Sequence, residues 1–313
     1  MEFSFNFDVQ VEVDEEVHNE ENATKYVDNP DKNIQELPQQ MTKETKEHIF
    51  PKNCEHLLEN VVPETLSVGT LPPLHYLNES VFEQTASEHA DHENILSQTI
   101  SSHSDLISGV YEGGLRIWEC TFDLLVYFER EKETFCGKQV LDLGCGAGLL
   151  GILALKKGAK QVHFQDYNST VIEDVTIPNV LLNCEEDDEE VICDSCPTQE
   201  RMNRCIFFSG DWCSFLPFIL SSKPAYQYDV ILTSETIYNP SYYNALHDIF
   251  QHLLTPQGVV YLATKVHYFG VGGGIHLFEN CVKEKGIFNF RSLTVVDEGL
   301  QRHVVALTFK TKV

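Results

Sequence analysis

The stretch VLDLGCGAGLLG, residues 140–151, decides the fold of this chain. Its first four residues are typical of a buried strand, three glycines follow, and apolar residues with helical spacing come after them. Without a Cβ, Gly144, Gly146 and Gly148 let a ligand approach the backbone closely. In an open α/β sheet the ligand lies at the carboxyl ends of the strands, so this turn predicts a binding site.

Predicted strands and helices alternate from residue 115 to residue 286, which indicates a parallel sheet, because parallel neighbours need a crossover between them. Two last alternating stretches are separated by a short turn and must pair antiparallel. We therefore expect an α/β fold with a seven-stranded sheet, mostly parallel, that ends in an antiparallel hairpin. Helices are expected at residues 115–129, 148–158, 168–184 (interrupted around Pro178), 241–254 and 275–286, and strands at residues 139–143, 161–166, 205–212, 228–238, 258–266, 288–299 and 302–313.

The charge of the chain is unevenly distributed. The formal net charge of the 313 residues is −26, and residues 1–100 alone hold 21 acidic and 5 basic side chains. Such a composition buries too little apolar surface to offset the entropy lost on folding. We expect residues 1–100 to be an acidic, largely disordered region and residues 101–313 to form the folded domain, with an acidic insertion at about 185–204.

The same composition restricts the partners of the protein. A chain this acidic repels naked nucleic acid, so we expect a basic protein partner and no direct contact with nucleic acid. We find neither a leader peptide nor a run of 18 apolar residues, and so expect no membrane insertion and no secretion. The ten cysteines then indicate reduced thiols in the cytosol or nucleus, and Cys193 with Cys196 lacks a second pair at zinc-site spacing, so no metal is predicted. Without an evident extra apolar surface, we expect a monomer.

Residues at three successive strand ends indicate the kind of ligand. The turn differs from a dinucleotide-binding turn, because Leu149 stands where the third glycine belongs. Asp142 at the first strand end places a negative charge that disfavours a pyrophosphate and favours a cation. Asp166 ends the next strand, where an acid accepts hydrogen bonds from ribose hydroxyls, and Asp211 with Trp212 supplies an acceptor and an aromatic surface at the third. Together these residues predict a nucleoside with a cationic amino-acid tail, such as S-adenosylmethionine, although each acid alone is equally consistent with a helix cap or a solvated loop.

Several longer segments carry a resemblance to a known family. They are SSHSDLISGVYEGGLRIWECTFDLL at 101–125, FQDYN at 164–168, SETIYNP at 234–240 and HYFGVGGGIHLF at 267–278. With the glycine turn, they resemble the seven-β-strand class I methyltransferases and, among these, the histidine protein methyltransferase 1 homologs over about residues 101–313. The resemblance implies a Rossmann-like fold, S-adenosylmethionine as cofactor, and methylation of the tele nitrogen of a histidine in a large-subunit ribosomal protein.

The resemblance also implies a cellular role, a location and a set of cofactor contacts. It implies a role in ribosome assembly or translation, a location in the cytoplasm and nucleus including the nucleolus, and chaperones as further partners. Where relatives carry basic residues, this chain has CDSCPTQERMNR at 193–204, so we do not expect that loop to serve nuclear import. The cofactor contacts that it implies are Ile117, Trp118, Glu119, Thr121, Asp142, Gly144, Gly146, Gly148, Gln165, Asp166, Tyr167, Gly210, Asp211, Trp212 and Ser234.

Methylation of histidine places a modest demand on the enzyme. A neutral imidazole is already nucleophilic near pH 7, so the catalytic group to seek is an acceptor for the N–H of the nitrogen nearer the backbone. SETIYNP follows the fourth strand, where we expect Glu235 to accept that proton and Tyr238 and Asn239 to position the ring. Alternatively, Glu235 pairs locally and Tyr238 only packs. The loop at 267–274 is interpreted as a flexible wall of the acceptor pocket, or else as a plain strand-to-helix connection.

His103 and the first helix each allow two interpretations. His103 lies between serines ahead of the domain and is a candidate for self-methylation, or else an ordinary exposed histidine. Trp118 and Phe122 are equally consistent with core positions on the first helix. The activity is open in the same way, because a lysine methyltransferase on the same fold, or a non-catalytic adapter for a ribosomal or chaperone partner, would carry many of the same motifs.

Overall fold

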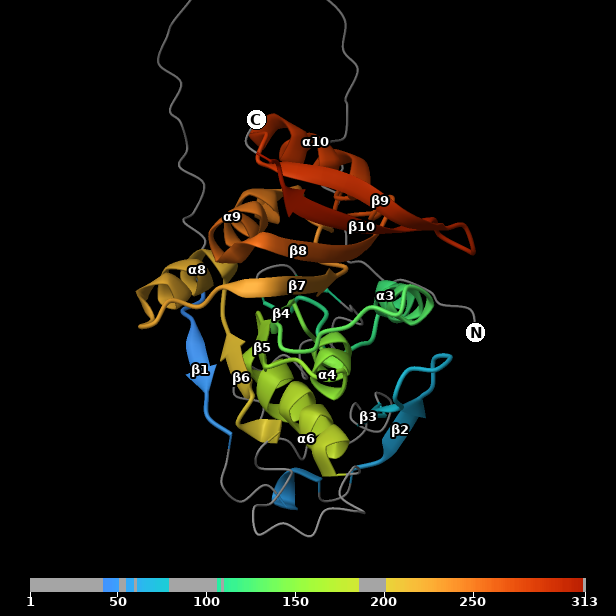
Figure 1. The fold of residues 1–313 in the computed structure, drawn as a ribbon, viewed down its shortest axis with the longest axis vertical. Coiled ribbons are helices and arrows are strands. Elements are labelled where there is room, and N and C mark those ends of the chain that lie inside the picture. The colour runs from blue at the N-terminus through green and yellow to red at the C-terminus, as the bar shows by residue number, and fades with distance from the viewer. Residues whose placement is uncertain are drawn as a thin grey trace, which may run out of the picture.

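A computed structural model of the protein describes residues 42–50, 55–58, 61–78, 106–107, 110–185 and 201–311. Its centre is an eight-stranded sheet with the strand order β1-β6-β5-β4-β7-β8-β10-β9, which twists across the molecule (Figure 1). The strands are β1 (Lys46–His48), β4 (Gln139–Leu143), β5 (Gln161–Asp166), β6 (Cys205–Ser209), β7 (Tyr228–Ser234), β8 (Leu254–Lys265), β9 (Phe288–Val296) and β10 (Arg302–Phe309).

The inner strands of the sheet run parallel and the C-terminal strands antiparallel. β4 pairs in parallel with β5 and with β7, β5 with β6, and β7 with β8. β10 lies antiparallel between β8 and β9. The predicted α/β class, the mostly parallel sheet and the C-terminal hairpin are confirmed. The parallel arrangement brings the carboxyl ends of β4 to β8 to one edge, beside the glycine turn.

Part of the acidic N-terminal region belongs to the fold. β1 pairs antiparallel with β6 and forms one edge of the sheet, which therefore has eight strands where seven were expected. A separate hairpin of β2 (Pro63–Leu66) and β3 (Leu74–Leu77) packs against α6 (Ile177–Glu185). Ordered structure thus begins before residue 101, the expected start of the domain. The mean composition of residues 1–100 concealed these segments because each of them is only three or four residues long.

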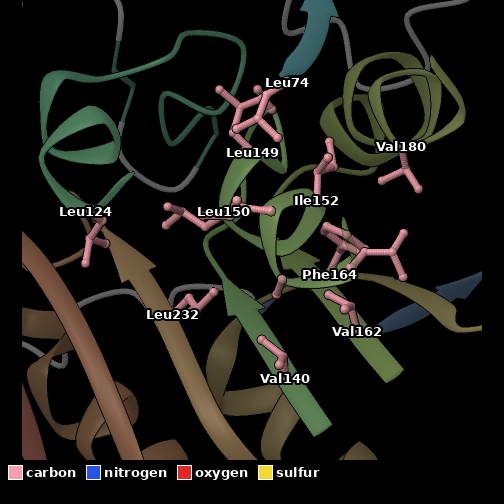
Figure 2. Close-up of a cluster of buried hydrophobic side chains, with 14 of the residues drawn as sticks. Leu74, Leu124, Val140, Leu149, Leu150, Ile152, Val162, Phe164, Val180 and Leu232 are labelled. Atoms are coloured by element: carbon pink, nitrogen blue, oxygen red, sulfur yellow. The ribbon is translucent and has the colours of Figure 1, made fainter. Parts of the chain in front are cut away.

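Helices cover both faces of the sheet. Their bounds are η1 (Glu55–Leu58), α3 (Glu119–Arg130), α4 (Leu149–Lys156), α5 (Ser169–Val171), η3 (Ile172–Thr176), α6 (Ile177–Glu185), α8 (Trp212–Ser221), η4 (Pro240–Tyr242), α9 (Tyr243–Leu253) and α10 (Ile275–Lys285). α3, α4 and α6 contribute to one buried apolar cluster, and α8, α9 and α10 to the other. Figure 2 shows the first cluster, where Leu150 and Ile152 of α4 lie over Val140 and Val162 of the strands.

Three helical expectations need correction. α3 begins at Glu119, later than expected, because the Trp118 Nε1–H donates to the Gly113 carbonyl at 2.9 Å and keeps the preceding turn out of the helix. α8 was not predicted; the third strand was expected to reach Trp212, but β6 ends at Ser209 and Trp212 begins this helix. The interruption around Pro178 is the π-helical turn η3 that precedes it, which accommodates a residue with no N–H to donate.

Some sequence features lie outside the described residues: His103, the pair Cys193 and Cys196, and residues 186–200 of the acidic insertion. Within the described part of the chain, no helix combines the length and the apolar character needed to cross a lipid bilayer. The same residues contain no cluster of His, Cys, Asp and Glu side chains arranged to hold a metal ion.

Candidate active site

A cavity of about 290 Å³ opens where the strands of the parallel sheet end. The predicted site residues that line it are Ile117, Trp118, Thr121, Gly144, Gly146, Asp166, Tyr167, Gly210, Asp211, Trp212, Ser234, Glu235 and Tyr238. The structure thus brings residues from five separate segments of the chain to one place. The predicted site residues that do not line the cavity are Glu119, Asp142, Gly148, Gln165 and Asn239, and Phe122 does not line it either.

Asp142 has a structural position behind the cavity. Its side chain is buried, and its carboxyl accepts a hydrogen bond from the Gly151 N–H at 2.8 Å, which anchors α4 to the end of β4. Burial raises the pKa of Asp142 to about 8, so the carboxyl is mostly protonated at pH 7. The expectation that Asp142 directs a negative charge toward a ligand is therefore corrected: its contact is with the helix backbone.

Asp166 retains the position expected for a ligand acceptor. It lines the cavity at the end of β5, and its carboxylate accepts hydrogen bonds from the Gly146 N–H at 3.0 Å and the Asn168 N–H at 3.2 Å. Burial raises its pKa to about 6, while these N–H groups act in the opposite direction. Asp166 is therefore mostly ionised at pH 7 and can accept hydrogen bonds from hydroxyl groups.

The ends of β5 and β6 are joined by a buried glutamine. The Gln165 amide donates to the Gly210 carbonyl at 2.8 Å and accepts from the Trp212 Nε1–H at 2.9 Å. Gln165 thus orients the indole ring without lining the cavity. Asp211 lines the cavity and also caps α8, since its Oδ1 accepts from the Cys213 N–H at 2.7 Å. Asp211 is thus a helix cap that also lines the cavity, and its role as an acceptor for a ligand amino group stays a prediction.

A buried cluster of charges forms the cavity wall at the ends of β7 and β8. Lys265 Nζ lies 3.0 Å from Glu119 Oε2 and 3.4 Å from Glu235 Oε1. Neither carboxylate oxygen of Glu235 has a hydrogen-bond partner among the described residues, although its side chain is buried. Burial and the neighbouring Glu235 raise the pKa of the Cys120 thiol and of the Tyr268 hydroxyl. Glu235 is therefore a buried carboxylate on the cavity wall that is paired with Lys265 but accepts no hydrogen bond from the described residues.

The backbone of Glu235 is also unusual. Its φ is 59°, in the left-handed region that residues with a side chain seldom adopt. The surrounding structure maintains this conformation, since the Glu235 N–H donates to the Ala263 carbonyl at 3.0 Å. Such conformations concentrate at active sites, where they hold a side chain in a required direction.

A second carboxylate that lines the cavity, Glu112, already accepts hydrogen bonds from two tyrosines. Glu112 accepts hydrogen bonds from the Tyr238 hydroxyl and, at 3.0 Å, from the Tyr242 hydroxyl. Burial, together with the charge of Glu112, raises the pKa of Tyr238, which therefore stays protonated. Asn239 caps η4 by accepting from the Ser241 N–H at 3.0 Å. Asn239 does not line the cavity, and its expected role in positioning an acceptor ring stays a prediction.

The loop after β8 combines the two interpretations given to it. Tyr268 lines the cavity, so this loop does supply part of a wall. Its glycines also make a close connection, since the Gly273 N–H donates to the Tyr238 carbonyl at 2.8 Å. The flexibility of this wall stays a prediction.

The sequence is similar to known proteins along most of its length. A family model described as lysine methyltransferase matches residues 103–269. The histidine protein methyltransferase 1 homolog of Bos taurus is 54% identical over 279 residues, which are 86% of this chain and 73% of that protein. The homolog of Mus musculus is 51% identical over 277 residues, 86% of this chain and 75% of that protein. The chain belongs to the histidine protein methyltransferase 1 homologs.

A member of this family is a protein methyltransferase, and its methyl donor is S-adenosylmethionine. The cavity fits this nucleoside. Gly144 has a φ of 65°, and a Cβ there would lie 2.6 Å from Thr236 Cγ2, so the turn at the end of β4 has room for backbone alone. The ionised Asp166 suits the ribose hydroxyls, and Asp211 and Trp212 suit the adenine amino group and ring. These assignments to individual residues stay predictions.

Several residues that line the cavity of this homolog were not anticipated, and Thr42, Glu112, Tyr242 and Lys265 are the polar ones that matter most here. Lys265 ends β8, and a polar residue at a strand end was the signal that identified the acids of the other strands. Thr42 carried no such signal, because its place depends on β1 pairing with β6, more than 150 residues away.

Proposed function

We propose that this protein methyltransferase transfers a methyl group to the tele nitrogen, Nε2, of a histidine in a large-subunit ribosomal protein. The observation that carries the proposal is Glu235, a buried carboxylate on the cavity wall that is paired with Lys265 and accepts no hydrogen bond from the described residues. A histidine side chain that enters the cavity can donate its Nδ1–H to this carboxylate. The names of the relatives, which specify histidine, support the same acceptor.

The chemistry follows from the tautomer of the acceptor. S-adenosylmethionine, when bound, supplies an electrophilic methyl group. Glu235 accepts the Nδ1–H of a neutral imidazole, which leaves the lone pair on Nε2 free to act as the nucleophile. As Nε2 gains the methyl group, the bond from the methyl group to sulfur breaks, S-adenosylhomocysteine leaves and the ring becomes positively charged. The negative charge of Glu235 stabilises this ring, and Glu235 is the acceptor for the Nδ1 proton that is lost when the ring becomes neutral.

The neighbours of Glu235 keep it available for this role. Lys265 lies 3.4 Å away and fixes one side of the carboxylate, while the left-handed backbone directs the side chain to the cavity. Glu112 is less suited, because Tyr238 and Tyr242 already donate to its two oxygens. Tyr238 accordingly shapes the cavity through Glu112 in this proposal.

The substrate class is supported by charge. The chain carries a formal net charge of −26, which attracts basic proteins and repels nucleic acid that is not covered by protein. Ribosomal proteins of the large subunit are basic and are encountered in the cytoplasm and nucleus. Methylation of such a protein would act on ribosome assembly or translation.

One experiment tests the acceptor and the substrate class together. Purified enzyme, isotopically labelled S-adenosylmethionine and isolated large-subunit ribosomal proteins are incubated, and the labelled residue is mapped by mass spectrometry. We expect the label on Nε2 of one histidine. A label on lysine would instead support the activity that the description of the matching family model favours. No label on any large-subunit protein, with label on other proteins, would exclude the ribosomal substrate.

Replacing Glu235 by glutamine tests the role of its charge. We expect Glu235→Gln to lower kcat by roughly 10²-fold, since general-base groups contribute about 10²–10⁴-fold and the amide oxygen retains part of the acceptor function. The matched control is Glu119→Gln, which removes the other carboxylate at Lys265 but none that lines the cavity. Full activity of Glu235→Gln, or an equal loss in both variants, would contradict the assignment.

A further inference from the structure

Residues 42–48, which we name the N-terminal strap, reach the cavity at Thr42 and continue into β1 at the edge of the sheet. Thr42 lines the cavity, and Lys43 Nζ lies 4.7 Å from the centre of the Tyr167 ring, which also lines it. We propose that the strap is part of the methyl-donor site, so that docking of the strap and binding of the donor stabilise each other. The proposal concerns the donor alone and is independent of which residue accepts the methyl group.

The strap holds the segment that presents Asp211 and Trp212 to the cavity. The Lys43 carbonyl accepts a hydrogen bond from the Asp211 N–H at 3.0 Å. The Thr45 N–H donates to Ser214 Oγ at 2.7 Å, and the Ser214 hydroxyl donates to Thr45 Oγ1 at 2.9 Å. The first turn of α8 is thus tied to the strap by both backbone and side chain.

Gly210, in the loop between β6 and α8, shows how closely the strap packs against this loop. Gly210 has a φ of 129°, and a Cβ there would lie 2.8 Å from the Glu44 carbonyl oxygen and from Thr45 Cα. Gly210 itself lines the cavity. The loop is therefore packed between the strap on one side and the cavity on the other, and a shift of one changes the other.

The far end of the strap is anchored away from the cavity. His48 is buried, with Nδ1 2.8 Å from Glu173 Oε1 and Nε2 2.7 Å from Ser209 Oγ. Lys46 Nζ lies 2.9 Å from the same oxygen of Glu173. None of these four residues lines the cavity, so the anchor can be weakened without touching the donor site.

Thermodynamic linkage makes docking of the strap and binding of the methyl donor reciprocal. β1 is three residues long and lies at the edge of the sheet, and such elements open at low free-energy cost compared with central strands. If donor binding favours the docked strap, then docking must raise donor affinity by the same factor. Both halves of this statement are measurable.

The first measurement uses the unmodified full-length chain. Backbone amide hydrogen exchange of residues 42–48 is followed with and without saturating S-adenosylhomocysteine, which lacks the transferable methyl group. We expect exchange in the strap to slow by about fivefold or more when the ligand is bound, in line with typical coupling between sites. The hairpin β2–β3 serves as the internal reference, and its exchange should not change.

The second measurement uses a matched pair of variants in the full chain. His48→Ala removes the anchor, whereas His75→Ala truncates another buried histidine of the N-terminal region, on β3 and outside the cavity lining. We expect His48→Ala to raise the Kd for S-adenosylhomocysteine, measured by calorimetry, by about fivefold or more, and His75→Ala to leave it within about twofold. An unchanged Kd in folded His48→Ala, or unchanged strap exchange in the parent chain, overturns the proposal.

Discussion

At the scale of the residue, burial decides what each carboxylate at the edge of the sheet can do. Asp142 is protonated at pH 7 and anchors α4, because burial outweighs its single hydrogen bond from the backbone. Asp166 stays mostly ionised, because the backbone N–H groups of Gly146, Tyr167 and Asn168 compensate part of the same penalty. Glu235 faces the cavity with Lys265 beside it. Three acids that look alike in the sequence thus lie in three different environments.

Replacing Asp142 by asparagine should stabilise the protein without ligand. The pKa of Asp142 is raised to about 8 in the folded state, so the stability it contributes is fully present below about pH 4 and is lost as the pH rises toward 8. We expect Asp142→Asn to raise the free energy of unfolding by about 2–4 kcal/mol at pH 7 and to have little effect at pH 4. Thermal or urea unfolding of both proteins across this range measures the difference. A variant that is less stable at pH 7 would show that Asp142 is ionised.

Donor affinity should depend on the ionisation of Asp166. Its pKa is raised to about 6 by burial, and the proposed contact with ribose hydroxyls requires the carboxylate. We expect the Kd for S-adenosylhomocysteine to be constant above about pH 7 and to rise toward tenfold per pH unit below about pH 6. Calorimetric titrations from pH 5 to pH 8 measure this. Asp166→Asn should bind weakly at every pH, and a pH profile identical to that of the parent chain would exclude Asp166 as the titrating group.

At the scale of the element, the glycine turn works because α4 packs directly against the strand beside it. Gly151 faces the ring of Phe164 on β5, and Phe164 is stacked on Phe207 of β6 with 5.2 Å between ring centres. Both rings are buried, and Figure 2 shows Phe164 beneath the helix. The absence of a side chain at Gly151 therefore lets α4 approach the sheet closely. This close approach sets the position of the glycine turn beside the cavity.

A methyl group at Gly151 should disturb both packing and binding. A Cβ there would lie 2.3 Å from Phe164 Cε1, a distance at which the ring or the helix has to move. We expect Gly151→Ala to lower the free energy of unfolding by about 1–3 kcal/mol, despite the better helix propensity of alanine. Chemical denaturation measures the loss, and calorimetry should show weaker donor binding because the turn is displaced. A stabilised variant would mean that α4 can shift freely.

At the scale of the whole molecule, the charge of the chain and the order of its strands act together. The acidic region near the N-terminus contributes β1 to one edge of the sheet, next to the strand end where the donor is expected. The same chain carries a net charge of −26, which acts over distances longer than any single contact. In the proposed reaction the N-terminal region therefore acts locally, through β1 beside the donor site, and at long range, through its contribution to the net charge that attracts a basic substrate.

Salt should separate substrate capture from donor binding. Attraction between an acidic enzyme and a basic protein is screened as the ionic strength rises. With isolated large-subunit proteins as substrate, we expect kcat/KM to fall by about tenfold or more between about 0.05 and 0.3 M salt. The Kd for S-adenosylhomocysteine should change by less than about twofold. If kcat/KM is independent of salt, then the net charge does not select the substrate.

The sequence by itself determined the fold class, the glycine turn and the edge of the sheet where the cavity lies. These features depend on local periodicity and on the rule that parallel strands end together, and both can be seen along the chain. Only the tertiary structure decided that Asp142 is neutral, that Lys265 joins Glu119 to Glu235, and that a strap from the acidic region reaches the cavity. Burial and long-range pairing produce these features, and both arise only when segments distant in sequence pack together.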